Sequence, residues 1–458
     1  MALWLIIVLA GMIIIAAWWY YTKRLDWQLA RVKSQLNEIA KRPQPTTKGK
    51  RKILRKIYKL LNASLNTGNA DNAYQAFDLL KLGLGNGLGC IGEPVKLTST
   101  IYLAIKLNQE DAAGHGIDAF RPLLKNMAAA EVPGAIEQLG LIAVISLKQR
   151  QNFLAARAVE VISMVMVLTP DEAVQEAVMR AYRLIGLTAF RRNDDGLIRE
   201  IQAKIASWLA AQPLNIVLHE YASRVMTVWL HRVVKTGDGK NFEALAQYIA
   251  QLTEKKVLSE QAIANIVKDC SHLSGMDSLN PYSQIAGAVS LLSLELAVQV
   301  RLLDTWRQSL DGAGQAARLA IAQRTLADSL AVVYPIFEIG RRLLVMELNT
   351  GFMPDTFRQQ ALFLLIRECL QLLEFITRQN FTTTVADCIE QIYQDWIVRQ
   401  INAGQQKSIQ RFCQLVFLYS IRMKRRQKHI PADTSSFNAE DVITPAQKEH
   451  LKQLGYLA

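Results

Sequence analysis

Apolar residues return at positions i, i+3, i+4 and i+7 from about Lys52 to Met423, the spacing of one face of an α-helix. These segments are about 12 to 30 residues long, and short Gly, Asn, Asp or Pro breaks separate them. Alternating β-branched runs with Asn-Gly turns, which mark strands, are essentially absent. The pattern therefore predicts an all-α chain.

Helix pairs return about every 40 residues, for example over 132–168, 171–210 and 214–252. Stacked pairs of this period form α-solenoids, such as HEAT-like or armadillo-like arrays. Because no residue signature recurs at fixed offsets, an irregular multi-helical body stays an alternative. We assign this helical body to residues 51–425. Within it, the sequence Thr169-Pro170-Asp171-Glu172 predicts a capping box with Thr169 as N-cap.

The N-terminus is apolar in a different way, because no charged side chain occurs between Ala2 and Trp19. At a rise of ~1.5 Å per residue, about 20 such residues cross a bilayer as a helix. A cleaved signal peptide is the alternative, but the first residues lack a basic side chain and bulky aromatic residues occupy 18–21, where small residues precede cleavage. We therefore predict a retained single transmembrane anchor over 1–22.

A short basic helix follows over 23–42, with an apolar stripe at alternating spacings of 4 and 3. Its members are Leu25, Leu29, Val32, Leu36 and Ile39. Such a stripe is the seam of a coiled coil, and it would pair two copies of the chain in a homodimer. The stripe runs for less than three heptads, which is marginal for an isolated coil. Prolines at 43 and 45 end the helix and begin a linker over 43–50.

The charge of the chain is concentrated in this region. Thirteen Lys and Arg lie between Lys23 and Lys59 against Asp26 and Glu38, so this segment carries +11 of the total +13. The positive-inside rule then places the N-terminus outside and the body in the cytoplasm. We predict that the basic residues nearest the anchor contact anionic lipid headgroups, namely Lys23, Arg24, Arg31, Lys33, Lys41, Arg42, Lys48, Lys50, Arg51 and Lys52. The alternative is a solvated linker whose charges only set topology.

A second basic cluster occupies 422–428, ahead of a polar tail over 426–458 that ends in a short helix. Nucleic-acid binding is disfavoured there, because Phe412, Phe417 and Tyr419 precede the basic cluster instead of alternating with it. Capping of the helix dipole by these cations is the simpler interpretation.

Several motifs resemble sites without meeting their requirements. Gly87-x-Gly89-x-x-Gly92 lacks the strand of a dinucleotide fold, and His219 and His231 lie too far apart for a helical zinc site. Two polar segments, 193–196 and 236–240, are interpreted as a helix cap and a turn. We predict no catalytic residue, metal or cofactor.

Five cysteines are dispersed without any CxxC pair, namely Cys90, Cys270, Cys369, Cys388 and Cys413. This usage predicts buried free thiols in a reducing compartment.

These observations favour a membrane-anchored helical scaffold that binds a protein partner at the cytoplasmic face. Two alternatives stay open: a membrane-tethered protein associated with nucleic acid, and a membrane-bound enzyme whose helical active site leaves no local motif.

Overall fold

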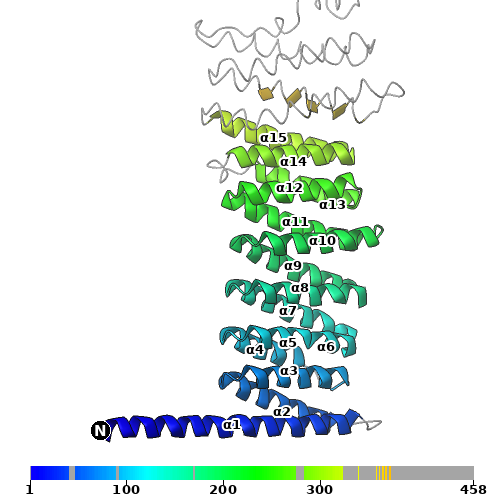
Figure 1. The fold of residues 1–458 in the computed structure, drawn as a ribbon. Helices are drawn as coiled ribbons and strands as arrows, with labels where there is room; N and C mark the ends of the chain where they lie inside the picture. The colour runs from blue at the N-terminus through cyan, green and yellow to red at the C-terminus, as the bar shows by residue number, and fades with distance from the viewer. Residues whose placement is uncertain are drawn as a thin grey trace, which may run out of the picture. The chain divides into compact units, whose positions relative to one another are not determined.

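The computed structural model describes residues 2–40, 47–88, 92–168, 171–274 and 283–322, together with single residues between 339 and 372. This part of the chain contains fifteen α-helices, one short 3-10 helix and no strand (Figure 1). The prediction of an all-α chain is confirmed. The helices form two compact units, Met1–Val225 and Met226–Ala458, which are described one at a time.

The helices of the first unit are α1 (Ala2–Ala40), α2 (Thr47–Asn66), α3 (Ala70–Gly85), α4 (Glu93–Lys106), α5 (Glu110–Asp118), α6 (Phe120–Asn126), η1 (Ala129–Glu131), α7 (Val132–Lys148), α8 (Asn152–Leu168), α9 (Glu172–Arg192) and α10 (Asp195–Ala211). α11 (Ile216–Thr236) has residues in both units. The second unit continues with α12 (Gly239–Glu254), α13 (Glu260–Ser274), α14 (Ser283–Val300) and α15 (Leu303–Ala322).

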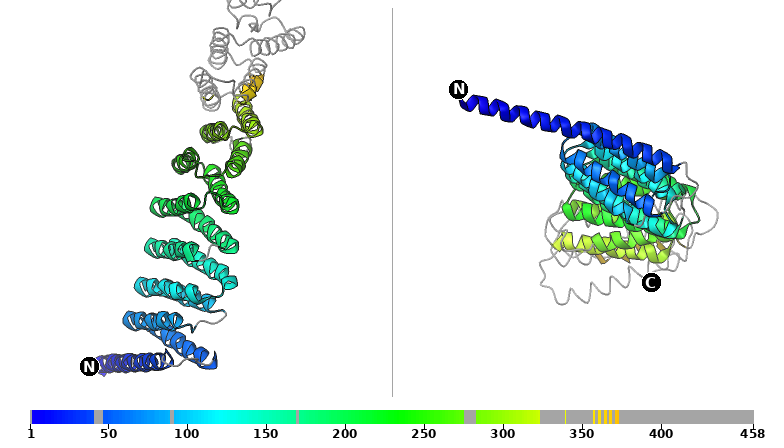
Figure 2. Two further views of the ribbon diagram at one scale, coloured as in Figure 1. Left: turned by 90° about the vertical axis from the view of Figure 1, so that its right-hand side faces the viewer. Right: turned by 90° about the horizontal axis from the view of Figure 1, so that it is seen from below.

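The first unit is a two-layered stack of helix pairs. In one layer α2, α4, α7 and α9 contact each other in turn, and in the other layer α3, α5, α8 and α10 do the same. Each helix of the first layer also packs on its successor in the second, as α7 does on α8 (Figure 2). This arrangement is solenoid-like, because each pair buries its apolar faces mainly against the neighbouring pairs.

Short turns with local caps connect the two helices of a pair. Asn193 adopts a left-handed conformation with φ 55° at the end of α9, and Asp194 then accepts a hydrogen bond from the backbone N–H of Leu197, 3.1 Å away. These two contacts end one helix and begin the next. The interpretation of residues 193–196 as a cap is confirmed.

The predicted pairs correspond to α7–α8, α9–α10 and α11–α12. The predicted capping box at Thr169 is wrong, because α9 begins at Glu172 and its N-cap is Asp171, whose side chain makes no capping hydrogen bond. Thr169 and Pro170 lie outside the described residues.

The second half of α1 belongs to the stack. Four members of the predicted seam, Leu25, Leu29, Val32 and Leu36, are buried, and α1 packs on α2 and α3. The side chain of Ile39 lies outside the described residues. The stripe therefore has its partners within the chain, and a coiled coil through the same residues would require α1 to leave them. α2 begins at Thr47, inside the segment assigned to the linker.

A glycine permits a close approach between three of the early helices. A Cβ added at Gly116 in α5 would lie 2.6 Å from Cγ1 of Ile101 in α4 and 2.7 Å from Cε1 of Phe77 in α3. Such distances are far inside van der Waals contact, so a side chain there would displace α5 from both α3 and α4.

In the second unit α13 packs on both α14 and α15. The indole of Trp306, which is fully buried, donates a hydrogen bond to the carbonyl of Ala361, 3.0 Å away. Most of α14 is buried, including Val289, Leu294 and Ala297. This apolar helix is thus part of the core of the unit. The basic cluster at 422–428 and the tail over 426–458 lie outside the described residues.

Candidate functional site

One segment of the described chain is long and apolar enough to cross a membrane, and it is Ala129–Lys148. It comprises η1 and α7, and half of its most apolar window is buried inside the stack. α7 packs on α4, α8 and α9, as expected of a core helix. This test does not select the N-terminal segment, so the anchor over 1–22 stays a prediction.

The first half of α1 nevertheless differs from every other apolar helix of the first unit. Its described side chains point into solvent, and α1 extends past the other helices at its N-terminal end (Figure 2). The large exposed side chains are Met12, Ile13, Ile14, Ile15, Trp19 and Tyr20, with Ile14 68% exposed. A contiguous exposed apolar surface on a protein marks a membrane or protein contact.

Aromatic and basic side chains follow directly after this apolar half. The ammonium of Lys23 lies 5.8 Å from the ring centre of Trp19, and the guanidinium of Arg31 lies 5.4 Å from that of Trp27. These are cation–π distances. Such pairs suit the boundary between hydrocarbon and water, where aromatic rings and long cations are enriched.

The outer face of α2 forms an open hollow of about 820 Å³ that is lined by basic residues alone. They are Lys48, Arg51, Lys52, Arg55, Lys56 and Lys59, which we call the α2 basic face. At 100° per residue they cover an arc of about 140° along some 17 Å of helix. The opposite face of α2, including Ile57 and Leu61, is completely buried.

None of the six cations has an acidic partner among the described residues. Lys56 donates a hydrogen bond to the amide oxygen of Gln35 in α1, at 3.2 Å, which is a neutral acceptor. The spacing makes the repulsion worse, because the six residues form seven like-charge pairs at i,i+3 or i,i+4. Each such pair destabilises a helix by about 0.2–0.5 kcal/mol at low salt. The like charges of the α2 basic face therefore destabilise the helix, and no ion pair within the described chain offsets this repulsion.

The structure separates the predicted lipid-contacting residues into groups. Lys48, Arg51 and Lys52 lie in the α2 basic face, whereas the Lys50 ammonium donates to the carbonyl of Gly87 at 3.1 Å. The remaining described members, Lys23, Arg24, Arg31 and Lys33, are exposed on α1, and Lys41 and Arg42 lie outside the described residues. Sequence reasoning stopped at Lys52 and so omitted Arg55, Lys56 and Lys59. Their i+3 and i+4 spacing from Lys52 was the signal that would have added them.

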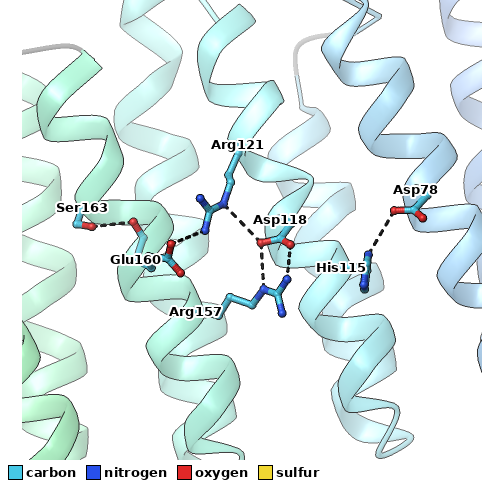
Figure 3. Close-up of polar contacts among 7 residues, drawn as sticks. All are labelled: Asp78, His115, Asp118, Arg121, Arg157, Glu160 and Ser163. Atoms are coloured by element: carbon cyan, nitrogen blue, oxygen red, sulfur yellow. Dashed lines mark hydrogen bonds and ion pairs between the residues drawn. The ribbon is translucent and has the colours of Figure 1, made fainter.

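A second charged cluster connects α5, α6 and α8 (Figure 3). Asp118 accepts two hydrogen bonds from the guanidinium of Arg157, one of them from Nε at 3.0 Å. Arg121 lies 3.5 Å from Asp118 and 2.8 Å from the carboxylate of Glu160. His115 contacts Asp78 of α3 at 3.3 Å at the edge of this cluster.

Burial alone would raise the pKa of Asp118, but the hydrogen bond and charge of Arg157, with the charge of Arg121, hold that pKa below its usual value. The same hydrogen bond raises the pKa of Arg157. Phe153, which is 63% exposed, and Glu200 also line the open hollow of about 620 Å³ beside these residues. Since the acids and bases of the network are paired with each other, we interpret it as cross-links between the stacked helices.

The rejected motifs have structural roles where the structure describes them. His219 is buried, and its Nε2 lies 3.2 Å from the carbonyl of Gln212, while Asp238 caps α12 through the N–H of Asn241. No group of three His, Cys, Asp or Glu suited to a metal occurs among the described residues.

Of the five cysteines, Cys270 is free and buried, and burial raises the pKa of its thiol to about 12. This agrees with the prediction for this thiol. The remaining four cysteines lie outside the described residues.

No protein-family model matches the chain, and no curated protein matches it. A solved structure described as a circular tandem repeat protein with novel repeat topology and enhanced subunit contact surfaces is similar over 95% of both chains. The identity is 12% and the TM-score 0.33, so this similarity supports no argument about the function of the chain.

Proposed function

We propose that the protein is a membrane-anchored helical scaffold, held by the first half of α1 and presenting the stacked helix pairs to a protein partner in the cytoplasm. One observation supports this most strongly: the same continuous helix is exposed and apolar in one half and buried in the stack in the other. A helix of this kind transmits the position of the membrane directly to the body, without a flexible joint between them.

The stacked helix pairs of the first unit support the proposed binding of a protein partner. Repeated helix pairs present extended surfaces that hold other proteins. The orientation rests on the distribution of Lys and Arg, which flank the apolar segment only on its C-terminal side.

The test is fractionation of two chains expressed in the same cells. The full chain is expected in the membrane pellet, resistant to alkaline carbonate, whereas a chain that begins at Lys23 is expected in the supernatant and folded. The cut at Lys23 keeps the buried residues of α1 that a cut at Lys50 would remove. Burying Leu25, Leu29, Val32 and Leu36 contributes about 1.5–3 kcal/mol each.

A matched control deletes the same apolar residues but restores a foreign transmembrane segment. This chimera is expected to return to the pellet. Recovery of the full chain in the carbonate supernatant, or of the chain from Lys23 in the pellet, contradicts the proposed anchor.

A further inference from the structure

We infer that the α2 basic face is a docking site for an acidic helical segment of a partner protein, and that it stands away from the lipid headgroups. This inference rests on the proposed anchor for its position relative to the membrane. The charge complementarity itself is independent of the anchor, because all six lining residues are cations without an acidic partner in the described chain.

The continuity of α1 fixes where the face lies. α1 is helical from Ala2 to Ala40, so the residues after Thr22 continue the axis of the apolar segment out of the bilayer. Gln35, which accepts the hydrogen bond from Lys56, lies thirteen residues beyond Thr22, about 20 Å further along the axis. Lys59, the member of the face nearest the predicted membrane, is three residues or about 4.5 Å closer than Lys56. The Debye length at physiological salt is about 8 Å, so headgroups at both distances are screened.

The direction of α2 adds to this separation. α2 begins beside the end of α1 that is far from the N-terminus (Figure 1). Lys48 is therefore further from the predicted membrane than Lys56. Of the basic residues predicted to contact lipid, Lys23 and Arg24 are the two that a continuous helix leaves at the headgroups.

The arrangement of the cations favours a helical acidic partner. Every member of the α2 basic face has another member three or four residues away, and carboxylates on a facing helix recur with the same rise. Arg and Lys together then meet a row of carboxylates along the whole 17 Å or so of the face.

Nucleic acid is disfavoured by the packing of α2. The major groove of duplex DNA is about 12 Å wide and admits a helix that protrudes, whereas α2 is packed against α1, α3 and α4. Single strands require aromatic rings on which bases stack, and no aromatic residue lines the hollow.

The experiment uses the full chain in phosphatidylcholine nanodiscs and a fluorescent helical peptide with glutamates at i, i+4, i+7 and i+11. The double substitution Lys52→Glu and Lys59→Glu is expected to weaken peptide binding at least tenfold. The control substitutions Lys106→Glu and Lys148→Glu change the net charge equally at two other exposed positions, and are expected to change binding less than twofold.

Two further arms separate the other ligands. Adding phosphatidylserine to the nanodisc is expected to leave peptide binding unchanged, and weaker binding would place the face on the headgroups and overturn the inference. Tighter binding of a short DNA duplex than of the peptide at physiological salt would also overturn it. So would equal losses in the two double variants. Failure of the chain to enter nanodiscs would count against the anchor, whereas insertion without peptide binding would count against the docking site.

Discussion

The first half of α1 and the helix α7 are both strongly apolar, yet the structure uses them in opposite ways. α7 passes the length and hydropathy test for a membrane span together with η1, and it contacts α4, α8 and α9. The described side chains of the first half of α1 are exposed instead. Composition alone therefore does not separate a core helix from a membrane helix, and the presence of packed neighbours does.

Charge shows the same contrast between paired and unpartnered groups. Asp118 is paired with two arginines inside the stack, whereas the α2 basic face gathers six cations on an open surface. In both contrasts, the group with neighbours is expected to contribute to folding, and the group without neighbours is expected to contribute to an interaction. Four predictions examine this difference.

The largest effect is expected from a charge placed in α7. Ile136 is fully buried, and Ile136→Asp would leave a buried carboxylate without a partner, at a cost of more than about 4 kcal/mol. Loss of the cooperative unfolding transition in circular dichroism is the measurement. The matched change Ile14→Asp in the exposed half of α1 is expected to leave that transition in place. If both substitutions unfold the protein, the contrast between the two helices is wrong.

A smaller effect is expected from truncation within α1 itself. Leu36 is 1% exposed, and Leu36→Ala would leave a cavity against α2 and α3 that costs about 2–5 kcal/mol. The urea midpoint of the chain that begins at Lys23 measures this loss. Ile15→Ala in the full chain, at an exposed position, is expected to stay within about 0.5 kcal/mol of wild type. Equal losses at the two positions would contradict the division of α1 into halves.

The next largest loss of stability is expected from removing one of the paired charges. Asp118→Asn would remove the charge that holds Arg157 and is expected to cost about 1.5–3 kcal/mol at neutral pH. Because the pKa of Asp118 is lowered by folding, its contribution is complete above the unfolded value of about 3.9 and disappears as pH falls through the folded value. The difference in unfolding free energy between the two proteins should thus vanish in strong acid.

An exposed ion pair supplies the control for this pH series. Glu137 pairs with Arg180 at 3.0 Å on the surface, and Glu137→Gln is expected to cost less than about 1 kcal/mol at any pH. A larger loss at Glu137 than at Asp118 would show that burial of the pair is not what stabilises it.

The smallest effect has the opposite sign. Lys59→Glu converts two like-charge pairs on α2, those with Arg55 and Lys56, into opposite-charge pairs. We expect a gain of about 1–2 kcal/mol at low salt that fades as salt is added. Thermal unfolding of the chain from Lys23 measures it. A loss of stability would mean that the α2 basic face supports folding, and the argument for an external partner would fail.

Periodicity was sufficient to predict the all-α class and the packed pairs α7–α8 and α9–α10, because stacked pairs bury one apolar face per helix. It could not predict which partner an apolar stripe would find. The stripe from Leu25 to Leu36 has coiled-coil spacing, yet its neighbours are α2 and α3. The local sequence shows the spacing of an apolar stripe, but it does not show which helix packs on that stripe.

The same limit applies to the candidate site. The concentration of positive charge near the N-terminus is evident in the sequence. The prediction of lipid contact considered all the basic residues from Lys23 to Lys52 as one segment. The course of α1 and α2 separates it, because Lys23 and Arg24 follow the apolar segment directly while Lys48 to Lys59 lie on another helix. The ion pairs of Asp118 with Arg157 and Arg121 were missed altogether. Asp118 and Arg157 are 39 positions apart in the sequence, so no local motif indicates that they form an ion pair.

The most direct test of the account compares nitroxide labels at Ile14→Cys and Leu141→Cys, in a cysteine-free background reconstituted in lipid. Leu141 is a partly exposed position on α7, which makes it the counterpart of Ile14. We predict that the label at 14 collides readily with oxygen, which concentrates in lipid, and little with a water-soluble nickel chelate, while the label at 141 shows the reverse. A label at 14 that meets the chelate as readily as the label at 141 would contradict the membrane anchor.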